Sequence, residues 1–236
     1  RTSCNSTNYA QNRAMARQAR IVLPGFPHHI TQRGNRRQQT FFGREDYALY
    51  RDLMIAACAS QRMVCWAWCL MPNHIHLVLQ PPDAGALARA LSEAHQRYTR
   101  HINAREGWTG YLWQGRFASC AMDEGHALAA VRYVELNPVK AQLVRRAEDW
   151  PWSSARYHVR GEVDGLTAAV EYLSRVPDWR RYLAGNLDAA EQARIGYFTQ
   201  TGYPMGAPDW LDALEASTGQ TLTPRRRGRP RRDAKG

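Results

Sequence analysis

The segment from Met63 to Gln80 constrains the fold of this chain most strongly, because it encodes two strands joined by a short turn. Its first run, MVCWAWCL, has the length and the aromatic content of a buried strand. Pro72 and Asn73 form a turn, and the next run, His74 to Gln80, has the two-residue period of a strand. The segment therefore predicts consecutive strands of a sheet.

The segments around these strands predict an α+β domain. Their order is strand, helix, strand, strand, helix, strand, helix, which favours an antiparallel sheet with helices packed on it. The third helix has Asp123 as its N-cap, reaches Leu136 and is expected to stop at Pro138. The other elements are an extended segment over 20–33, helices over 44–62 and 84–103, and a strand or ribbon over 110–122.

Changes in composition and in periodic pattern divide the chain into four regions. Residues 1–15 are polar and aperiodic, and we expect them to be a flexible segment before a main domain over 16–149. Residues 150–223 carry short helical patterns and no strand signal, which predicts a small helical region. Residues 224–236 are rich in arginine and predict a disordered basic tail.

Charge and composition narrow the class of partner. The chain has 236 residues and a formal net charge of +11, which favours an anionic partner, nucleic acid before a membrane surface. No apolar run approaches the roughly 20 residues of a spanning helix, so we expect no membrane segment. The cysteines fit no ordinary zinc spacing and are expected to be reduced residues of a cytosolic protein: Cys4, Cys58, Cys65, Cys69 and Cys120.

His74 and His76 stand one residue apart in the second strand of the opening segment. Alternate residues of a strand face the same way, so the two rings share a face, while Ile75 and Leu77 point to the other and can form core. Two imidazoles side by side on a strand are a good start for a divalent metal site. The alternative is a pair of half-exposed surface histidines, and the spacing alone does not decide between them.

The third helix offers a reacting group and a further ligand. Tyr133 and Asn137 are four residues apart and therefore neighbours on one helix face, away from the apolar stripe of Val131 and Val134. The alternative is that Tyr133 covers the edge of the sheet and that Asn137 caps the helix before Pro138. Residue spacing leaves both interpretations open.

Several of these segments, taken in order, resemble a known family. MPNHIHLVL, LWQGRF, YVELNPVKAQLV and WPWSS are similar to segments of the REP-associated tyrosine transposases, which are relatives of the single-tyrosine, HUH-type insertion-sequence transposases. HHITQRGNRRQ and RRRGRPRR also match members of that family. The resemblance covers roughly residues 16–160 closely, and it implies a ferredoxin-like HUH nuclease fold for the main domain.

The resemblance implies specific roles for the residues just described. His74 and His76 stand where the family binds Mg²⁺ or Mn²⁺, and Tyr133 stands where the family has its nucleophile. Asn137 stands where insertion-sequence relatives carry a glutamine as third ligand, so its reach is one methylene shorter. Such enzymes cleave and rejoin single-stranded DNA at the foot of a REP-like hairpin through a 5′-phosphotyrosine, as a monomer or a homodimer.

The basic residues are expected to contact this DNA. Arg227 and Arg229 flank Gly228 in a sequence that resembles an AT-hook, in which extended arginines lie in a narrow minor groove. The alternative for the tail is a generic basic segment that raises affinity through counterion release. The alternative for the arginines before the tail is that they lie on solvated faces of the protein. The other expected DNA-binding residues are Arg33, Arg36, Arg37, Arg97, Arg100 and Arg116, and Trp108, Tyr111, Trp113 and Phe117 either stack on unpaired bases or fill the core.

Two other functions compete with a transposase. A replication initiator or relaxase of the same HUH chemistry often carries a helicase domain, and this sequence has no phosphate-binding Gly-Lys-Ser/Thr loop. A hairpin-binding regulator without catalysis is the other alternative, against which the presence of His74, His76 and Tyr133 argues. The favoured reading is a bacterial, cytoplasmic, nucleoid-associated enzyme.

Overall fold

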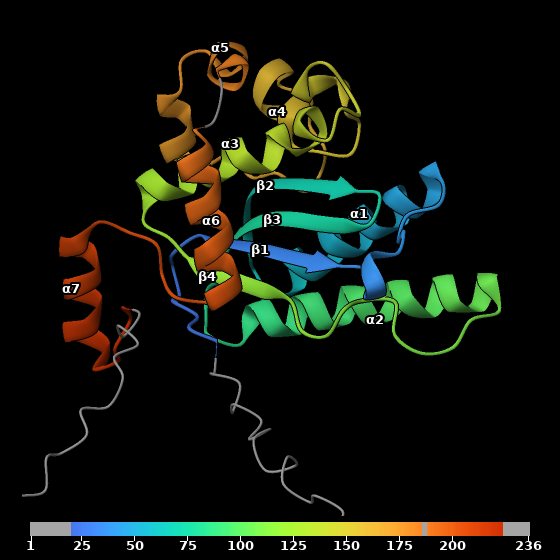
Figure 1. Cartoon of the computed structure of the whole chain (residues 1–236), viewed down its shortest axis with the longest axis horizontal. Coiled ribbons are helices and arrows are strands. Elements are labelled where there is room, and N and C mark those ends of the chain that lie inside the picture. The colour runs from blue at the N-terminus through green and yellow to red at the C-terminus, as the bar shows by residue number, and fades with distance from the viewer. Residues whose placement is uncertain (1–19, 186–187, 224–236) are drawn as a thin grey trace, which may run out of the picture.

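The computed structural model describes residues 20–185 and 188–223, and its centre is a four-stranded sheet (Figure 1). The strands are β1 His28–Arg33, β2 Val64–Met71, β3 His74–Gln80 and β4 Ala118–Ala121. They lie in the order β2-β3-β1-β4, and every neighbouring pair is antiparallel. The predicted α+β class is therefore confirmed, with β1 and β3 as the two inner strands.

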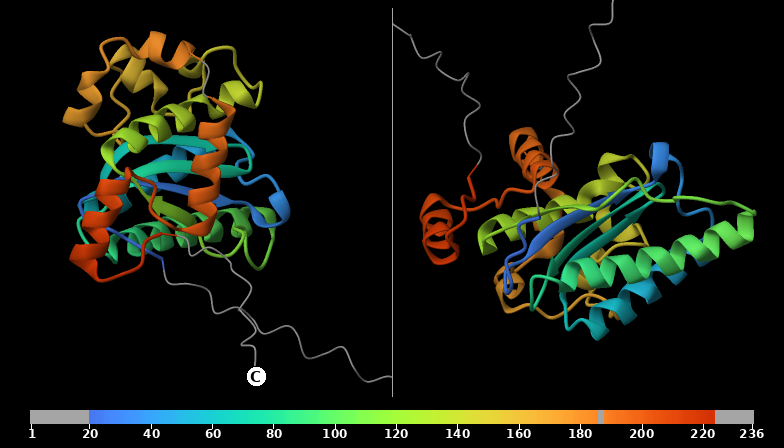
Figure 2. Two further views of the ribbon diagram at one scale, coloured as in Figure 1. Left: turned by 60° about the vertical axis from the view of Figure 1, so that its left-hand side comes forward. Right: turned by 90° about the horizontal axis from the view of Figure 1, so that it is seen from below.

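Helices cover both faces of the sheet. Helices α1 Arg44–Ser60 and α2 Ala86–Glu106 pack together on one face, as Figure 2 shows from two further sides. Helix α3 Glu124–Lys140 and helix α6 Ala189–Thr201 lie on the other face, where α6 contacts β4 and β1. Each face has its own cluster of buried apolar side chains.

The two buried faces change one expectation from the sequence. Ile75 and Leu77 lie in the core under α1 and α2, as expected. The face that carries His76 was expected to point away from any core, and this is wrong, because Val78 on the same face packs against Val131 and Val134 of α3. The histidine face is therefore enclosed by a helix, which excludes water from part of it.

The strand expected over 110–122 is shorter than predicted. Only Ala118–Ala121 pair with β1, and residues 110–117 form a loop in which Gly110 and Gly115 have positive φ angles of 92° and 60°. The loop runs beside the end of β1, where the amide of Gln114 donates to the carbonyl of Arg33 at 2.8 Å. The extended segment expected over 20–33 likewise becomes a strand only from His28 onward.

Helix α3 continues through Pro138 to Lys140, although the sequence predicted that it stops there. A proline inside a helix leaves a carbonyl one turn earlier without its backbone donor. Here the side-chain amide of Asn137 donates to the carbonyls of Tyr133 at 2.8 Å and Val134 at 3.4 Å. The side chain thus replaces the missing donor, and the helix gains a last turn that holds Lys140.

The region after Trp150 is helical, as expected, with no element of the sheet in its described part. Its elements pack on the main body, and Leu70 of β2 donates its amide to the carbonyl of Trp152. The predicted flexible segment over 1–15 and basic tail over 224–236 lie outside the described residues. The shorter elements are η1 Asn35–Arg37, η2 Ala147–Asp149, α4 Ala155–Arg160, η3 Glu171–Arg175, α5 Trp179–Ala184 and α7 Pro208–Thr218.

Cys58, Cys65, Cys69 and Cys120 are buried and free, which agrees with the expectation that they are reduced. Burial raises the pKa of Cys58 to about 12 and that of Cys120 to about 11. These thiols therefore stay protonated at neutral pH and contribute as small apolar groups. Among the helices that the structure describes, none is long and apolar enough to cross a membrane.

The stability of the fold should fall as the pH drops from about 6.5 to about 4. Burial lowers the pKa of His28 to about 4 and that of His95 to about 3, whereas an unfolded histidine titrates near 6.5. Between these values the unfolded chain binds protons that the native chain does not, so acid favours unfolding by several kcal/mol in total. Urea titrations at several pH values measure this slope. His95→Gln should flatten it, and an unchanged slope in that variant would contradict the assignment.

Candidate active site

Four aromatic side chains from three elements meet on the enclosed face of the sheet. His76 of β3 lies with its ring centre 4.9 Å from that of His74 and 5.3 Å from that of His29 on β1. Tyr133 of α3 presents its ring at right angles to both neighbours, 5.5 Å from His76 and 5.6 Å from His29. The structure thus brings together His74, His76 and Tyr133, which the sequence singled out separately.

Both sequence-predicted histidines are neutral at physiological pH. His76 is 5% exposed, and burial, followed by the neighbouring rings of His29 and His74 and the charges of Arg33 and Lys140, holds its pKa well below the usual value. Burial and the nearby charge of Arg33 lower the pKa of His74 to about 4. A neutral imidazole keeps a lone pair on one ring nitrogen, so both rings have the protonation state that a metal ligand requires.

Hydrogen bonds engage the Nδ1 atom of each ring. His74 Nδ1 lies 2.7 Å from Oδ1 of Asn73, an amide oxygen that can only accept, so Nδ1 carries the hydrogen and Nε2 keeps the lone pair. His76 Nδ1 lies 3.1 Å from Nε2 of His29. Metal-ligating histidines are typically held in this way, with one nitrogen fixed by the protein and the other left for the ion.

A divalent cation held by His74 and His76 would need a further protein ligand. Within residues 20–185 and 188–223, no group of three or more His, Cys, Asp or Glu is arranged to hold a metal. A third protein ligand would therefore be a residue other than His, Cys, Asp or Glu, and Asn137 is the residue that the resemblance implies. Its amide nitrogen bonds to the carbonyls of its own helix, which leaves the side-chain oxygen as the free acceptor. An amide oxygen suits Mn²⁺ or Mg²⁺, whereas imidazoles are slightly soft ligands for Mg²⁺, so Mn²⁺ should fit this set at least as well.

Tyr133 is half-buried beside two positive charges. Burial raises the pKa of its hydroxyl above the usual value, and the charge of Arg33 acts in the opposite direction. The ammonium of Lys140, two helical turns further along α3, lies 5.9 Å from the centre of the ring. The hydroxyl is therefore protonated at neutral pH, and cations stand close to the place where charge would develop if it reacted.

An open cavity of about 590 Å³ begins at Tyr133 and runs between α3 and α5. Its floor includes Leu136, Val139 and Leu183, and its only acidic lining residue is Glu148. The basic side chains around it are Lys140, Arg145, Arg146 and Arg180. An extended anion that reached Tyr133 would have room and positive charge here.

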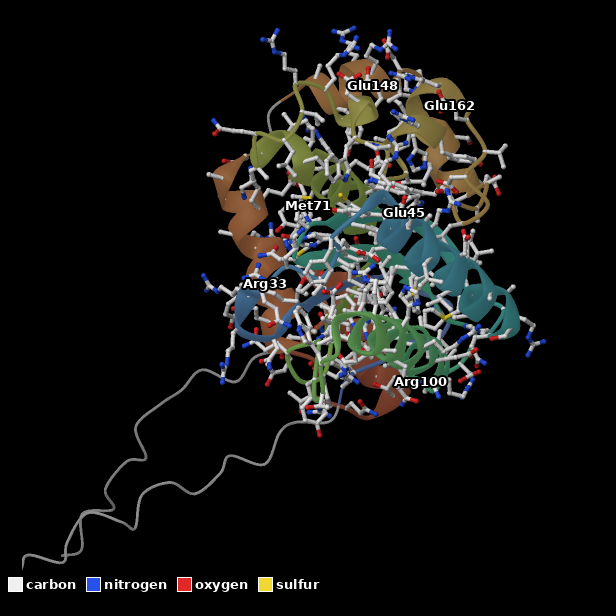
Figure 3. All side chains as sticks on the ribbon, turned by 90° about the vertical axis from the view of Figure 1, so that its right-hand side faces the viewer. Arg33, Glu45, Met71, Arg100, Glu148 and Glu162 are labelled. Atoms are coloured by element: carbon white, nitrogen blue, oxygen red, sulfur yellow. The ribbon has the colours of Figure 1, made fainter. Side chains whose placement is uncertain are left out.

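The expected DNA-binding residues before the tail fall into three groups. Arg33 ends β1, and Arg36 and Arg37 follow in the left-handed backbone region with φ angles of 53° and 63°. All three are exposed, and Figure 3 labels Arg33 together with Arg100 of α2. Non-glycine residues held in this region cost about 1–3 kcal/mol each and often mark functional loops.

Arg100 and Arg116 meet across a second cavity of about 590 Å³, beside the loop over 110–117. No acidic residue lines it, and Tyr111, which is 87% exposed, stands at its edge. Arg36 lines an adjoining cavity that shares Tyr111. Trp113 and Phe117 are buried in the core, the alternative that the sequence left open for them.

The other expected arginines are placed differently. Arg97 lies outside both cavities and pairs with Glu93 at 3.6 Å along α2. Arg227 and Arg229 lie outside the described residues, so the AT-hook interpretation stays a prediction.

Three residues that contact the site were not assigned to it by the sequence analysis. Asn73 was assigned only to a turn, although its place before His74 makes it a natural hydrogen-bond partner. His29 was assigned only to an extended segment, and its proximity to His76 depends on how β1 pairs with β3. Thr199 of α6 lies 2.7 Å from Nδ1 of His29, across 170 positions of the chain.

Comparisons with known proteins show which family this chain is similar to. The family model described as Transposase IS200 like matches residues 25–137. A REP-associated tyrosine transposase of Haemophilus influenzae is 30% identical over 125 residues, covering 48% of this chain and 71% of its own. One from Escherichia coli is 24% identical over 121 residues, covering 51% and 70%.

A solved structure supports the fold. It is described as a REP-associated tyrosine transposase bound to a REP hairpin, and it is similar to this chain with a TM-score of 0.53 and 24% sequence identity. The match covers 66% of this chain and 93% of that one. The chain therefore belongs to the REP-associated tyrosine transposases, within the IS200-like transposase family, and is a DNA strand-transferring enzyme.

Proposed function

We propose that this chain is a metal-dependent transposase that cleaves and rejoins single-stranded DNA at REP-like hairpins through a 5′-phosphotyrosine. The observation that carries the proposal is the convergence of Tyr133 with two neutral histidines on one enclosed face. The relatives named REP-associated tyrosine transposases, and the similar structure bound to a REP hairpin, support the choice of substrate.

The residues have distinct parts in this reaction. The Tyr133 oxygen loses its proton and attacks the scissile phosphorus in line. The bond to the 3′ oxygen breaks, and that oxygen takes up a proton and leaves as a 3′-hydroxyl. His74, His76 and Asn137 would hold Mg²⁺ or Mn²⁺, which when bound neutralises the phosphate and orients it. Because the phosphotyrosine conserves the energy of the phosphodiester, a free 3′-hydroxyl can rejoin without a nucleotide cofactor.

Positive charge beside the nucleophile assists the same step. A tyrosine hydroxyl with a raised pKa is a weak nucleophile at neutral pH, so it must lose its proton as the bond forms. Arg33 and Lys140 stand close enough to influence the ionisation of groups in the site. We infer that they stabilise the developing phenolate and the phosphate that it attacks.

The DNA would extend from the active site over the loop that carries Arg36 and Arg37, and over the second cavity, which no acidic residue lines. Arg33, Arg36 and Arg37 contact phosphates, and Arg100 and Arg116 hold the strand across the second cavity. The exposed ring of Tyr111 offers a stacking platform for an unpaired base. The basic tail with Arg227 and Arg229 adds affinity for the duplex flank.

The test is incubation with Mn²⁺ and an oligonucleotide that carries a REP-like hairpin with single-stranded flanks and a label at each end, because the adduct retains the 3′ end and the released fragment retains the 5′ end. We expect a labelled protein band on a denaturing gel, together with a shortened oligonucleotide that ends in a 3′-hydroxyl. A fully double-stranded oligonucleotide of the same sequence is the control and should give neither product. Hairpin binding without either product would favour the hairpin-binding regulator over the enzyme.

Arg100→Gln combined with Arg116→Gln should weaken hairpin binding and flatten its salt dependence. Single-strand phosphate contacts contribute about 0.7 each to the slope of log K against log salt, so the slope should fall by about 1.4. Fluorescence anisotropy over a salt series measures this.

Arg97→Gln is the control for the Arg100 position, because it removes one positive charge from the same helix outside the cavity. An equal loss of affinity in Arg97→Gln would mean that the DNA also contacts α2 at Arg97. No loss of affinity in the double variant would refute the cavity as a DNA site.

Tyr111→Ala should weaken binding of unpaired flanks more than Tyr111→Phe does, because only phenylalanine keeps the stacking surface.

A further inference from the structure

A chain of buried hydrogen bonds runs from helix α6 to the proposed metal ligand His76. The hydroxyl of Thr199 lies 2.6 Å from the carbonyl oxygen of Ile195 in its own helix and 2.7 Å from Nδ1 of His29. Nε2 of His29 lies 3.1 Å from Nδ1 of His76. Thr199, His29 and His76 are all buried, so bulk water does not compete for these bonds.

The direction of each bond follows from counting hydrogens, starting at the carbonyl of Ile195. That oxygen carries no hydrogen, so the Thr199 hydroxyl must donate to it. The hydroxyl has no second hydrogen, so Nδ1 of His29 donates to it. A neutral His29 then has a bare Nε2, which can only accept from Nδ1 of His76. His76 is left with its lone pair on Nε2.

We propose that Thr199 and His29 are positioning residues that hold His76 in the tautomer whose Nε2 is free to bind a metal ion. A neutral imidazole carries its hydrogen on either nitrogen, and the hydrogen bond made by one nitrogen decides whether that nitrogen carries it. The inference rests on the proposed metal-dependent function. Thr199 lies outside the matched residues 25–137, so the C-terminal region, through α6, takes part in building the active site.

Helix α6 contributes a hydrogen-bonding group to the site in addition to its apolar packing on the sheet. Packing of α6 on β1 and β4 would be served by any apolar side chain at position 199, as Ile195 shows one turn earlier. A hydroxyl with a donor and an acceptor partner at hydrogen-bond distance does something that a methyl group cannot, because it fixes where the next hydrogen lies. The other polar contact of Thr199 is the thiol of Cys120 at 3.5 Å, a weak partner.

The test compares Thr199→Val with Thr199→Ser. Valine keeps the shape and removes the hydroxyl, whereas serine keeps the hydroxyl. The first readout is the ¹⁵N NMR spectrum of the histidine rings in metal-free protein, which reports the tautomer of His76 directly. The second is Mn²⁺ affinity, measured by the electron paramagnetic resonance signal of the free ion.

We expect wild type and Thr199→Ser to hold the hydrogen of His76 on Nδ1. Thr199→Val should shift His76 toward the other tautomer and weaken Mn²⁺ binding by about tenfold or more, as loss of a partner of a metal-bound histidine commonly does. The matched control is Thr201→Val, because Thr201 is exposed on the same helix and its hydroxyl bonds only to carbonyls of α6. It should change neither readout.

An unchanged tautomer and unchanged Mn²⁺ affinity in folded Thr199→Val would overturn the proposal. If Thr199→Val does not fold, His29→Phe replaces it, because the ring keeps its packing and loses the acceptor for His76. A wild type that binds no Mn²⁺ would refute the proposed metal role, whereas the tautomer of His76 still decides whether the hydrogen-bond chain exists.

Discussion

Tyr133→Phe is expected to abolish the covalent protein–DNA adduct while leaving the fold and hairpin binding intact. Phenylalanine keeps the ring that packs at right angles to His29 and His76, and it removes only the oxygen that forms the bond to phosphorus. Loss of a nucleophile typically costs about 10⁴-fold or more in turnover, so no adduct should be visible on a denaturing gel. Anisotropy with the labelled hairpin checks that binding is unchanged.

Tyr111→Phe is the control for this variant, because it removes a hydroxyl from an exposed tyrosine of the proposed DNA surface. It should form the adduct at close to the wild-type rate. An adduct that persists in Tyr133→Phe would move the nucleophile elsewhere. Tyr111 would then be the first candidate, since Tyr98 is fully buried and its hydroxyl donates to the carbonyl of Thr40.

The second large effect is expected from the proposed metal ligands. His76→Ala, or His74→Ala, should reduce Mn²⁺-dependent cleavage by about 100-fold or more, because one imidazole and one amide hold a hard cation poorly. EDTA should have the same effect on the wild type, and an excess of Mn²⁺ should restore it. Cleavage rates at saturating hairpin, with Mn²⁺ binding measured on the same samples, test this.

His101→Ala is a suitable control, since His101 is exposed on α2 and contributes nothing to the ring cluster. Far-ultraviolet circular dichroism and thermal unfolding check that the buried His76 position tolerates alanine. Wild-type cleavage that continues in EDTA would refute the metal role, and the nucleophile prediction for Tyr133 would still stand or fall on its own.

The sequence determined what depends on residues close together along the chain. Strand periodicity places His74 and His76 on one face, and helical spacing places Tyr133 beside Asn137, because backbone geometry fixes both relations locally. The order of the elements was also predictable, since each strand and helix has its own period of apolar residues. The end of α3 was not, because the stop signal of Pro138 is overridden by a hydrogen bond from Asn137.

Only the tertiary structure decided which of these local features meet. The pairing of β1 with β3 sets His29 beside His76, and the packing of α6 on β1 brings Thr199 to His29. Neither contact has a periodic signature, because strand register and helix docking follow from how two apolar cores fill space on opposite faces of one sheet. The tyrosine proposed to react and the histidine pair are therefore readable in the sequence, whereas the residues proposed to orient them are brought there by long-range packing.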